Sequence, residues 1–238
     1  MNNFKWKKIL LKISGESLMG DDSFGINTDV VKSFAYEISE VVKSGLQICI
    51  VVGGGNIYRG ISNANNGMDR TTGDYMGMLA TVMNSLAIQN SLEQIGIQTR
   101  VQSALPISAV CEPYIRRRAK RHMEKGRVVI FAAGTGNPYF TTDTGASLTA
   151  IEIQADLMIK ATNVDGIYDS DPMKNTEAKK FDHITYDQAI DQRLAVMDIT
   201  AMVLCNENDL DMSVCNISEK NALLALARGE NLGTRVTK

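Results

Sequence analysis

The chain has 238 residues, of which 44% are hydrophobic and 22% are charged, and its 25 Lys and Arg against 27 Asp and Glu give a formal net charge of −2. This balance is typical of a folded globular protein, and it provides no bulk electrostatic attraction for nucleic acid or for an anionic membrane. The two histidines, His122 and His183, lie at no metal-ligand spacing from Cys or Glu, which argues against a zinc hydrolase and against a Ser/His/Asp enzyme.

Short apolar runs alternate along the chain with Gly-rich or polar turns and with segments of helical spacing, which is typical of βα units and of a mostly parallel sheet. No linker is visible, so we expect a single domain over residues 1–238 with about eight strands. The expected elements, in chain order, are a strand at 8–13, a helix capped by Thr28, a strand at 46–52, a helix at 72–95, a strand at 97–102, a helix at 112–125, a strand at 128–133, a helix at 143–154, a strand at 156–161, a helix at 196–207, a strand at 212–216 and a helix at 218–228 capped by Ser218.

Nothing in the sequence suggests export or a membrane. The apolar run that follows the basic start is only three residues long before Lys12 interrupts it, whereas a signal peptide needs about 7–15 apolar residues and a membrane span needs ~18. The four cysteines form no C-x-x-C motif and are typical of free thiols in a reducing compartment. We therefore expect a cytoplasmic protein without a membrane partner.

Three loops directly follow apolar strands, at the edge where open α/β sheets bind ligands. In the first, Lys12 precedes the turn Ser14-Gly15, an arrangement that suits a phosphate, although a solvated lysine at a strand end explains it equally well. The second, residues 53–60, begins with three glycines that expose backbone N–H groups and contains Arg59, whose planar guanidinium matches phosphate oxygens. A purely structural turn would explain these glycines but not the arginine.

The third loop, residues 134–143, offers hydroxyls, an amide, bare glycines and a carboxylate, which is more polar capacity than one helix cap needs. Asp74 either caps the helix that follows or accepts hydrogen bonds from ribose hydroxyls. Gly145, just inside the helix at 143–154, costs roughly 0.5–1 kcal/mol unless another backbone must come close. The sequence contains no G-x-x-x-x-G-K-[ST] motif and neither glycine loop completes G-x-G-x-x-G, so a P-loop enzyme is excluded and a dinucleotide site is disfavoured.

Six blocks of the sequence together resemble one family, in the family's order and spacing. They are KISGESL at 12–18, GGGNIYRG at 53–60, GDYMGMLAT at 73–81, GTGNPYFTTD at 134–143, KATNVDGIYDSDP at 160–172 and VMD at 196–198. They resemble the bacterial uridylate (UMP) kinases of the amino acid kinase superfamily. The resemblance implies a three-layer αβα sandwich around a mostly parallel sheet, with the UMP site mainly in the N-terminal part and the ATP site mainly in the C-terminal part.

The resemblance also assigns roles to matching positions. Asp143 would organise the transfer centre, and Asp198 would be a second acidic residue near it. The residues implied to be catalytic are Lys12, Arg59, Asp143 and Asp198; those implied to bind ATP are Lys12, Ile13, Ser14, Gly15, Gly55, Arg59, Thr162, Asn163, Tyr168 and Asp171; and those implied to bind UMP are Gly54, Asp74, Thr135, Gly136, Asn137, Pro138, Tyr139, Phe140, Thr141 and Thr142.

The implied reaction is reversible transfer of the γ-phosphoryl group of ATP to UMP, with Mg²⁺, in pyrimidine nucleotide biosynthesis. The family further implies a homohexamer, activation by GTP and inhibition by UTP, with Gly20, Asp21, Asp22, Ser23, Phe24 and Gly25 in the position of its GTP-effector segment. The physical chemistry agrees, because such a transfer needs two anions held in line and their charge neutralised. Asp143 would not touch phosphate but could orient Lys12 or a hydrated Mg²⁺. The metal ligands stay open.

Two other functions remain possible from the residues. The first is a relative that phosphorylates a carboxylate or carbamate, against which Asp74 and the loop at 134–143 argue. The second is a non-catalytic nucleotide sensor or nucleic-acid-binding regulator, against which Lys12, Arg59 and Asp143 argue. The basic run at 116–121 contains no aromatic residues for stacking on bases, so we interpret it as a solvated helix face.

Overall fold

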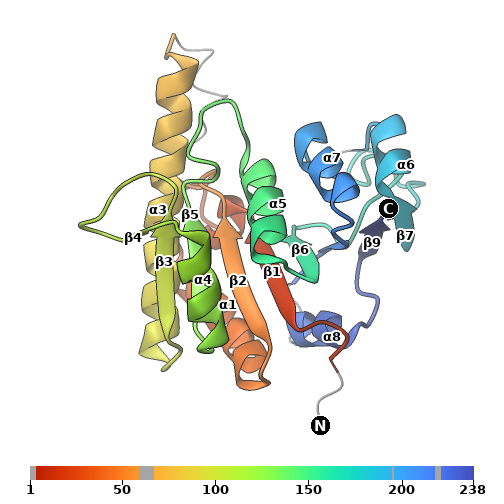
Figure 1. Ribbon diagram of the computed structural model, residues 1–238. Helices are drawn as coiled ribbons and strands as arrows, with labels where there is room; N and C mark the ends of the chain where they lie inside the picture. The colour runs from red at the N-terminus through yellow and green to blue at the C-terminus, as the bar shows by residue number, and fades with distance from the viewer. Residues whose placement is uncertain (1–3, 59–66, 195, 218–220) are drawn as a thin grey trace.

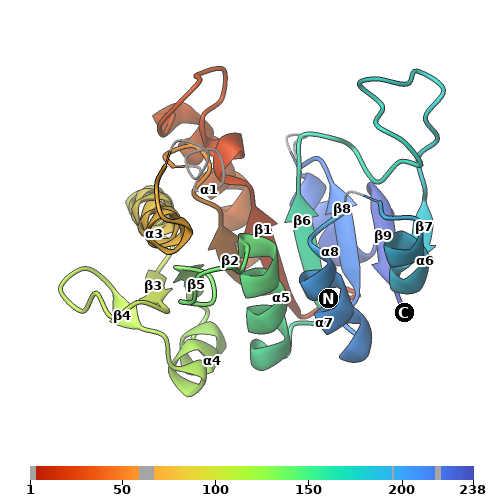
Figure 2. The ribbon, with the colours of Figure 1, turned by 90° about the horizontal axis from the view of Figure 1, so that it is seen from above.

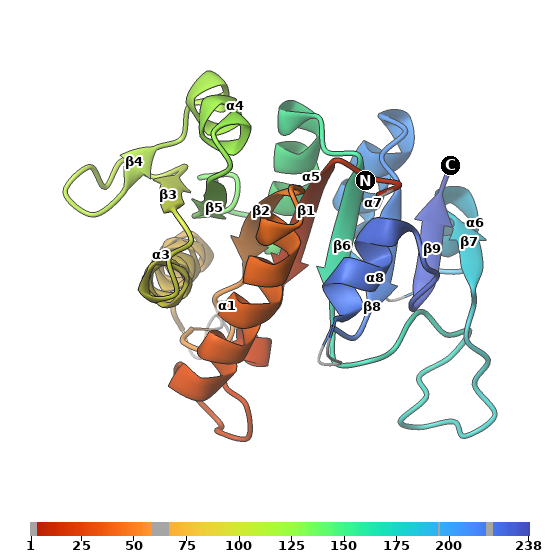
Figure 3. The same cartoon turned by 90° about the horizontal axis from the view of Figure 1, so that it is seen from below.

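The computed structural model describes residues 4–58, 67–194, 196–217 and 221–238 (Figure 1). Within these residues, a central sheet lies between two layers of helices, as the sequence predicts (Figures 2 and 3). The elements in chain order are β1 (Lys8–Ile13), the 3₁₀ helix η1 (Gly15–Leu18), α1 (Thr28–Lys43), β2 (Gln47–Val52), α3 (Arg70–Gln94), β3 (Thr99–Ser103), β4 (Glu112–Pro113), α4 (Arg116–Glu124), β5 (Val128–Ala132), α5 (Thr142–Ile153), β6 (Leu157–Ala161), β7 (His183–Thr185), α6 (Tyr186–Asp191), α7 (Ile199–Glu207), β8 (Met212–Cys215), α8 (Ala222–Arg228) and β9 (Thr234–Thr237).

The sheet is almost wholly parallel, with the strand order β4-β3-β5-β2-β1-β6-β8-β9-β7 among the described residues. Only β8 and β9 pair antiparallel. β1, β2, β5 and β6 occupy its centre, and their residues are nearly all buried because helices cover both faces. From β1 the chain continues to β2 on one side, and from β6 it continues to β8 on the other side, so a topological switch point lies between β1 and β6. Such a point is where open sheets bind ligands.

Each face of the sheet has its own apolar core. α1, α3 and α8 cover one face, where Ile38, Ile88 and Leu226 are buried against the strands. α4, α5, α6 and α7 cover the other, with Met123 and Ile153 in its core. Both cores draw on alternate residues of the same strands.

The sheet has nine strands in the described chain, one more than the eight that we expected. The strands that we did not predict are short and lie at or next to the two edges of the sheet. β4 lies inside the segment 112–125, which we predicted to be helical, and this helix begins only at Arg116. Glu112 precedes Pro113, and a residue before proline is disfavoured in the helical region, so it pairs with Gln102 of β3 instead. β7, α6 and β9 were also not predicted.

Several other predicted helix starts or caps were also wrong by one or more residues. α1 is capped by Asn27, whose side-chain oxygen accepts hydrogen bonds from the N–H groups of Asp29 and Val30, and not by Thr28. α7 begins at Ile199 rather than at residue 196, with Asp198 as its cap. α8 begins at Ala222, and Ser218, its predicted cap, lies outside the described residues.

α3 is unusual because part of its apolar surface faces outward. Tyr75, Met76, Leu79 and Met83 recur at helical spacing and are all more than a third exposed. We define these four residues as the α3 stripe. Neither α3 nor any other helix of the described residues combines the length and hydropathy needed to cross a bilayer.

Candidate active site

The site is built where β5, β2, β1 and β6 end side by side. Lys12 of β1 and Lys160 of β6 are register partners on neighbouring strands, so both side chains point to the same face of the sheet. That face is covered by α5, whose first turn contains Asp143. The loops that follow β1, β2 and β5, which we predicted to bind ligands, surround this point.

Asp143 bridges the two lysines. Its Oδ1 lies 2.6 Å from Nζ of Lys12, and its Oδ2 lies 2.7 Å from Nζ of Lys160. The three side chains are only 12–17% exposed. Lys160 also donates a hydrogen bond to the carbonyl of Val196. A contact with Lys12 is one of the two roles that we left open for Asp143, whereas Lys160 has no assigned role among the predicted site residues.

The charges of this cluster stabilise one another. Burial alone would raise the pKa of Asp143, but the ammonium groups of Lys12 and Lys160 outweigh it and hold that pKa below its usual value. Burial lowers the pKa of Lys160, with Lys12 acting in the same direction and Asp143 opposing. Two cations and one carboxylate leave a net positive charge at the sheet edge. Such a cluster attracts an anion such as a phosphate.

Asp198 lies next to this cluster but has a different set of contacts. Its carboxylate caps α7 by accepting a hydrogen bond from the N–H of Ala201, at 3.0 Å. It also accepts hydrogen bonds from the hydroxyls of Thr141 and Thr144, at the start of α5. Thr141 is itself the cap of α5. Asp198 therefore fixes the helix end that carries Asp143, and its predicted catalytic role remains a prediction.

Gly145 allows α5 to approach the loop that follows β5. A Cβ atom at Gly145 would lie 2.9 Å from Cα of Gly134, closer than carbon atoms pack. The expected cost of a glycine at this position is therefore offset by a close backbone contact. This contact brings Asp143 and the loop at 134–143 together.

A cavity of about 410 Å³ opens beside the cluster, between α3 and the loops after β2 and β5. Seven of the ten residues predicted to bind UMP line it, whereas Gly136, Pro138 and Tyr139 belong to the same loop but do not line the cavity. Gly55, which we predicted to contact ATP, also lines it. The seven predicted UMP residues that line the cavity are Gly54, Asp74, Thr135, Asn137, Phe140, Thr141 and Thr142.

Asp74 is held in this cavity by two partners. Nε of Arg70 donates to both carboxylate oxygens at 2.9 Å, and the N–H of Tyr139 donates to Oδ2 at 2.8 Å. The guanidinium of Arg70 also lies 5.5 Å from the centre of the Tyr139 ring. Asp74 is not a helix cap, because Asp69 caps α3. A carboxylate has about four lone-pair positions, so Asp74 keeps acceptor capacity for a ligand.

A second cavity, of about 540 Å³, lies on the other side of Lys160. Thr162, Tyr168 and Asp171, which we predicted to hold the adenosine end of ATP, line it together with Lys160 itself. Four further predicted ATP residues, Lys12, Ile13, Ser14 and Gly15, lie at the end of β1 and the start of η1. Arg59 lies outside the described residues.

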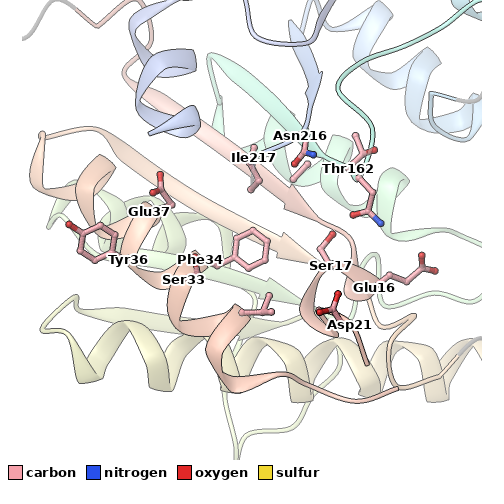
Figure 4. Close-up of a pocket in the computed structure, with 14 residues that line it drawn as sticks. Glu16, Ser17, Asp21, Ser33, Phe34, Tyr36, Glu37, Thr162, Asn216 and Ile217 are labelled. Atoms are coloured by element: carbon pink, nitrogen blue, oxygen red, sulfur yellow. The ribbon is translucent and has the colours of Figure 1, made fainter. Parts of the chain in front are cut away.

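A third cavity, of about 660 Å³, lies on the opposite face of the sheet, between η1, α1 and the ends of β6 and β8 (Figure 4). Glu16, Asp21 and Glu37 place carboxylates around it, and Phe34 forms part of its apolar wall. Asn163, predicted to bind ATP, lines this cavity rather than the second one. Of the predicted effector segment 20–25, only the first two residues line it, and its described lining contains no lysine or arginine to hold a polyphosphate.

Arg70 and the buried polar residues of α3 were missed at the sequence level. Arg70 stands four residues before Asp74, and this spacing places the two on one helix face. The contact between Arg70 and Asp74 could therefore have been predicted from the sequence. Thr81 and Asn84, which contact the loops after β5 and β2, carry no comparable signal.

The arrangement of two lysines, a bridging carboxylate and glycine loops at a sheet edge is one that binds and aligns phosphate groups. The sequence model of the amino acid kinase family matches residues 7–216 of the chain. The chain therefore belongs to the amino acid kinase family.

Individual relatives narrow this class. The uridylate kinase of Methylococcus capsulatus is 58% identical over 229 residues, which cover 96% of each chain. The crystal structure of UMP kinase from Bacillus anthracis superposes with a TM-score of 0.94 at 36% identity and covers 98% of this chain and 96% of that one. The UMP kinase structure from Ureaplasma parvum gives a TM-score of 0.92 at 38% identity, with 98% and 100% covered. Within its family, the chain is one of the uridylate kinases.

Proposed function

We propose that the protein transfers the γ-phosphoryl group of MgATP to UMP and releases UDP and ADP, a step of pyrimidine nucleotide synthesis. The observation that carries this proposal is the position of the Lys12–Asp143–Lys160 cluster. Lys160 lines the 540 Å³ cavity, and Thr142, the neighbour of Asp143, lines the 410 Å³ cavity. A donor nucleotide in the former and an acceptor in the latter would bring their phosphates to the lysines.

The chemistry requires little from the protein beyond this placement. A phosphate oxygen of UMP attacks the γ-phosphorus, the bond from that phosphorus to the β–γ bridging oxygen breaks, and ADP leaves with the electron pair. The attacking oxygen is already ionised, so no base has to remove a proton. The ammonium groups of Lys12 and Lys160 neutralise the charge that spreads over the transferred group.

Mg²⁺ would enter as part of the ATP complex. Each carboxylate oxygen of Asp143 is paired with a lysine ammonium group. This arrangement fits a metal ion carried by the nucleotide phosphates, because Mg²⁺ commonly binds substrate phosphates and keeps several waters.

Activation by GTP, inhibition by UTP and a homohexamer are further parts of the proposal, taken from the resemblance. A cytoplasmic location is another part, taken from the residues. The α3 stripe supports self-association, because contiguous exposed apolar residues on one helix favour contact with another protein surface. The four free cysteines are compatible with a reducing compartment. Measurement of the molecular mass of the protein in solution, with and without GTP, tests whether it forms a homohexamer.

The acceptor can be identified by a coupled assay of ADP release. We expect turnover with UMP, weaker turnover with dUMP and CMP, and none with acetylglutamate or carbamate. The pocket accounts for the weaker turnover with dUMP, which lacks a ribose hydroxyl, because Asp74 offers acceptor oxygens for such hydroxyls. Turnover only with acetylglutamate or carbamate would identify a carboxylate or carbamate kinase, and binding of UMP and ATP without turnover would identify a nucleotide sensor.

Asp74 provides a second test of the acceptor site. We expect Asp74→Asn to raise the KM for UMP by roughly 10- to 100-fold, since a hydrogen bond to a charged group is worth about 1.5–3 kcal/mol. The KM for ATP should change less than about threefold, because Asp74 lines only the 410 Å³ cavity. Initial rates at varied UMP and ATP measure both constants. An equal rise in the two values would show that Asp74 does not face the acceptor.

A further inference from the structure

Two buried asparagines, Asn56 and Asn84, face each other beneath the proposed phosphate site. Asn56 directly follows the three glycines of the loop after β2, and Asn84 lies in the middle of α3. Their exposed fractions are 1% and 0%. Neither lines the cavities described above, so neither has a role in the site so far.

The two amides form a fully satisfied pair. Nδ2 of Asn84 donates to Oδ1 of Asn56 at 2.7 Å, and Nδ2 of Asn56 donates to Oδ1 of Asn84 at 3.0 Å. The second hydrogens go to backbone carbonyls, from Asn84 to Gly53 at 2.7 Å and from Asn56 to Gly25 at 2.8 Å. Because carbonyl oxygens only accept hydrogen bonds, these contacts fix the orientation of both amides.

The loop after β1 packs directly on this pair. A Cβ atom at Gly15 would lie 2.6 Å from Oδ1 of Asn56 and 2.7 Å from the backbone nitrogen of Gly55. The N–H of Gly53 also donates to the carbonyl of Ile13 at 2.9 Å. The amide pair therefore lies where the two glycine-containing loops meet. A shift of Asn56 would separate Gly55 from the turn that follows Lys12.

α3 holds the third loop of the site from the same helix face. Thr81 lies one turn before Asn84, and its hydroxyl accepts a hydrogen bond of 2.7 Å from the N–H of Ala133. Ala133 has a φ of +66°, which an alanine adopts only when its surroundings hold it there. One turn of α3 thus anchors the loops after both β2 and β5. Both loops line the 410 Å³ cavity.

We propose that Asn56 and Asn84 are positioning residues for phosphoryl transfer. They touch no substrate and act through the loop 53–55, which they fix relative to Lys12 and Gly15. This inference rests on the proposed kinase activity. Its physical basis is that a misplacement of about 1 Å at a reacting group can cost on the order of 100-fold in rate.

The test uses Asn84→Asp, which keeps the size of the side chain. It replaces the donor that faces Gly53 and Asn56 with an oxygen, so three acceptors meet and the loop has to move. We expect kcat to fall by roughly 10- to 100-fold. The KM for ATP should change less than about threefold, since neither α3 nor the loop 53–55 lines the 540 Å³ cavity. Asn84→Ser, which removes the contacts without adding charge, should show the same split more weakly if the aspartate variant folds poorly.

Ser85→Ala is the matched control. Ser85 is also fully buried in α3, and its hydroxyl donates only to the carbonyl of Thr81 within the helix. Its loss should lower thermal stability without changing kcat. All three variants are assayed at a temperature below their melting temperatures, where they are folded. If Asn84→Asp or Asn84→Ser then has the same kcat as Ser85→Ala, the pair is merely structural and the inference is wrong.

Hydrogen–deuterium exchange separates this inference from the proposed function. In Asn84→Asp, we expect faster exchange in the peptide that contains residues 53–58 than in Ser85→Ala, whatever the substrate is. If the wild-type protein does not phosphorylate UMP, the proposed function fails, and the exchange result still decides whether the pair holds the loop. Unchanged exchange at 53–58 would contradict the inference even in an active enzyme.

Discussion

Asp143→Asn should lower kcat by roughly 100- to 1,000-fold, the effect seen when one preorganised electrostatic group is removed from an active site. The carboxylate currently holds two ammonium groups at 2.6 and 2.7 Å. Asparagine has nearly the same shape but can neutralise neither lysine. Lys12 and Lys160 would repel each other, and one of them would turn away or lose its proton. Steady-state kinetics with saturating UMP and ATP measure the loss.

The same substitution should lower the free energy of unfolding by about 2 kcal/mol, since it removes charge-assisted hydrogen bonds from a largely buried carboxylate. The pKa of Asp143 lies below its usual value. Its stabilising contribution is therefore complete above the unfolded pKa and is lost only as the pH falls through the lower, folded one. At pH 7, urea denaturation should show the full difference.

Asp209→Asn is a control for the change of charge. Asp209 lies between α7 and the start of β8, at the opposite edge of the sheet, and its side chain is 71% exposed. We expect its kcat and stability to remain close to those of the unchanged protein. A kcat of Asp143→Asn within a few-fold of Asp209→Asn would exclude Asp143 from the transfer centre.

Lys12→Met should lower kcat by about 100-fold or more and leave the protein folded. Methionine fills most of the space of the lysine stem, and Asp143 keeps Lys160 as a partner. The loss arises because no other described cation occupies the end of β1 beside the glycine turn. Lys12→Arg should recover little, because a planar guanidinium does not replace a compact ammonium group in a site this enclosed.

Lys8→Met is the matched control for this variant. Lys8 is in the same strand and on the same face, four residues earlier, and its ammonium group donates to the carbonyl of Ile153 at the far end of α5. Its loss removes a lysine from β1 without reaching the site. Comparable kcat values for Lys8→Met and Lys12→Met would mean that Lys12 does not act on the transferred phosphate.

The central strands could be predicted because their chemistry is local. β1, β2, β5 and β6 are short apolar runs between glycine or polar turns, the pattern of strands buried on both faces. β4, β7 and β9 have two to four residues and carry too few apolar positions for a pattern. These short strands, at or next to the edges of the sheet, are specified by their neighbours in the sheet rather than by their own sequences.

The parts of the site that lie within one sequence motif could be predicted. The contacts between segments that are distant in the sequence could not. The sequence indicates the three loops, but it leaves open whether Asp143 contacts Lys12 or a hydrated Mg²⁺. The contact of Asp143 with Lys160 depends on the register of β1 against β6, which no local pattern specifies. Asn56 and Asn84 are 28 residues apart and read separately as a turn residue and a helix residue. Only the packing of α3 on the loops brings them together.

The most direct test of the account follows the transferred phosphate itself. The purified protein is incubated with Mg²⁺, UMP and ATP labelled in the γ-phosphate, and the products are separated. We predict that the label appears in the β-phosphate of UDP in proportion to the ADP formed, and that Asp143→Asn abolishes most of it. Label found only in inorganic phosphate, or no consumption of ATP with UMP present, would contradict the assignment of this site to UMP phosphorylation.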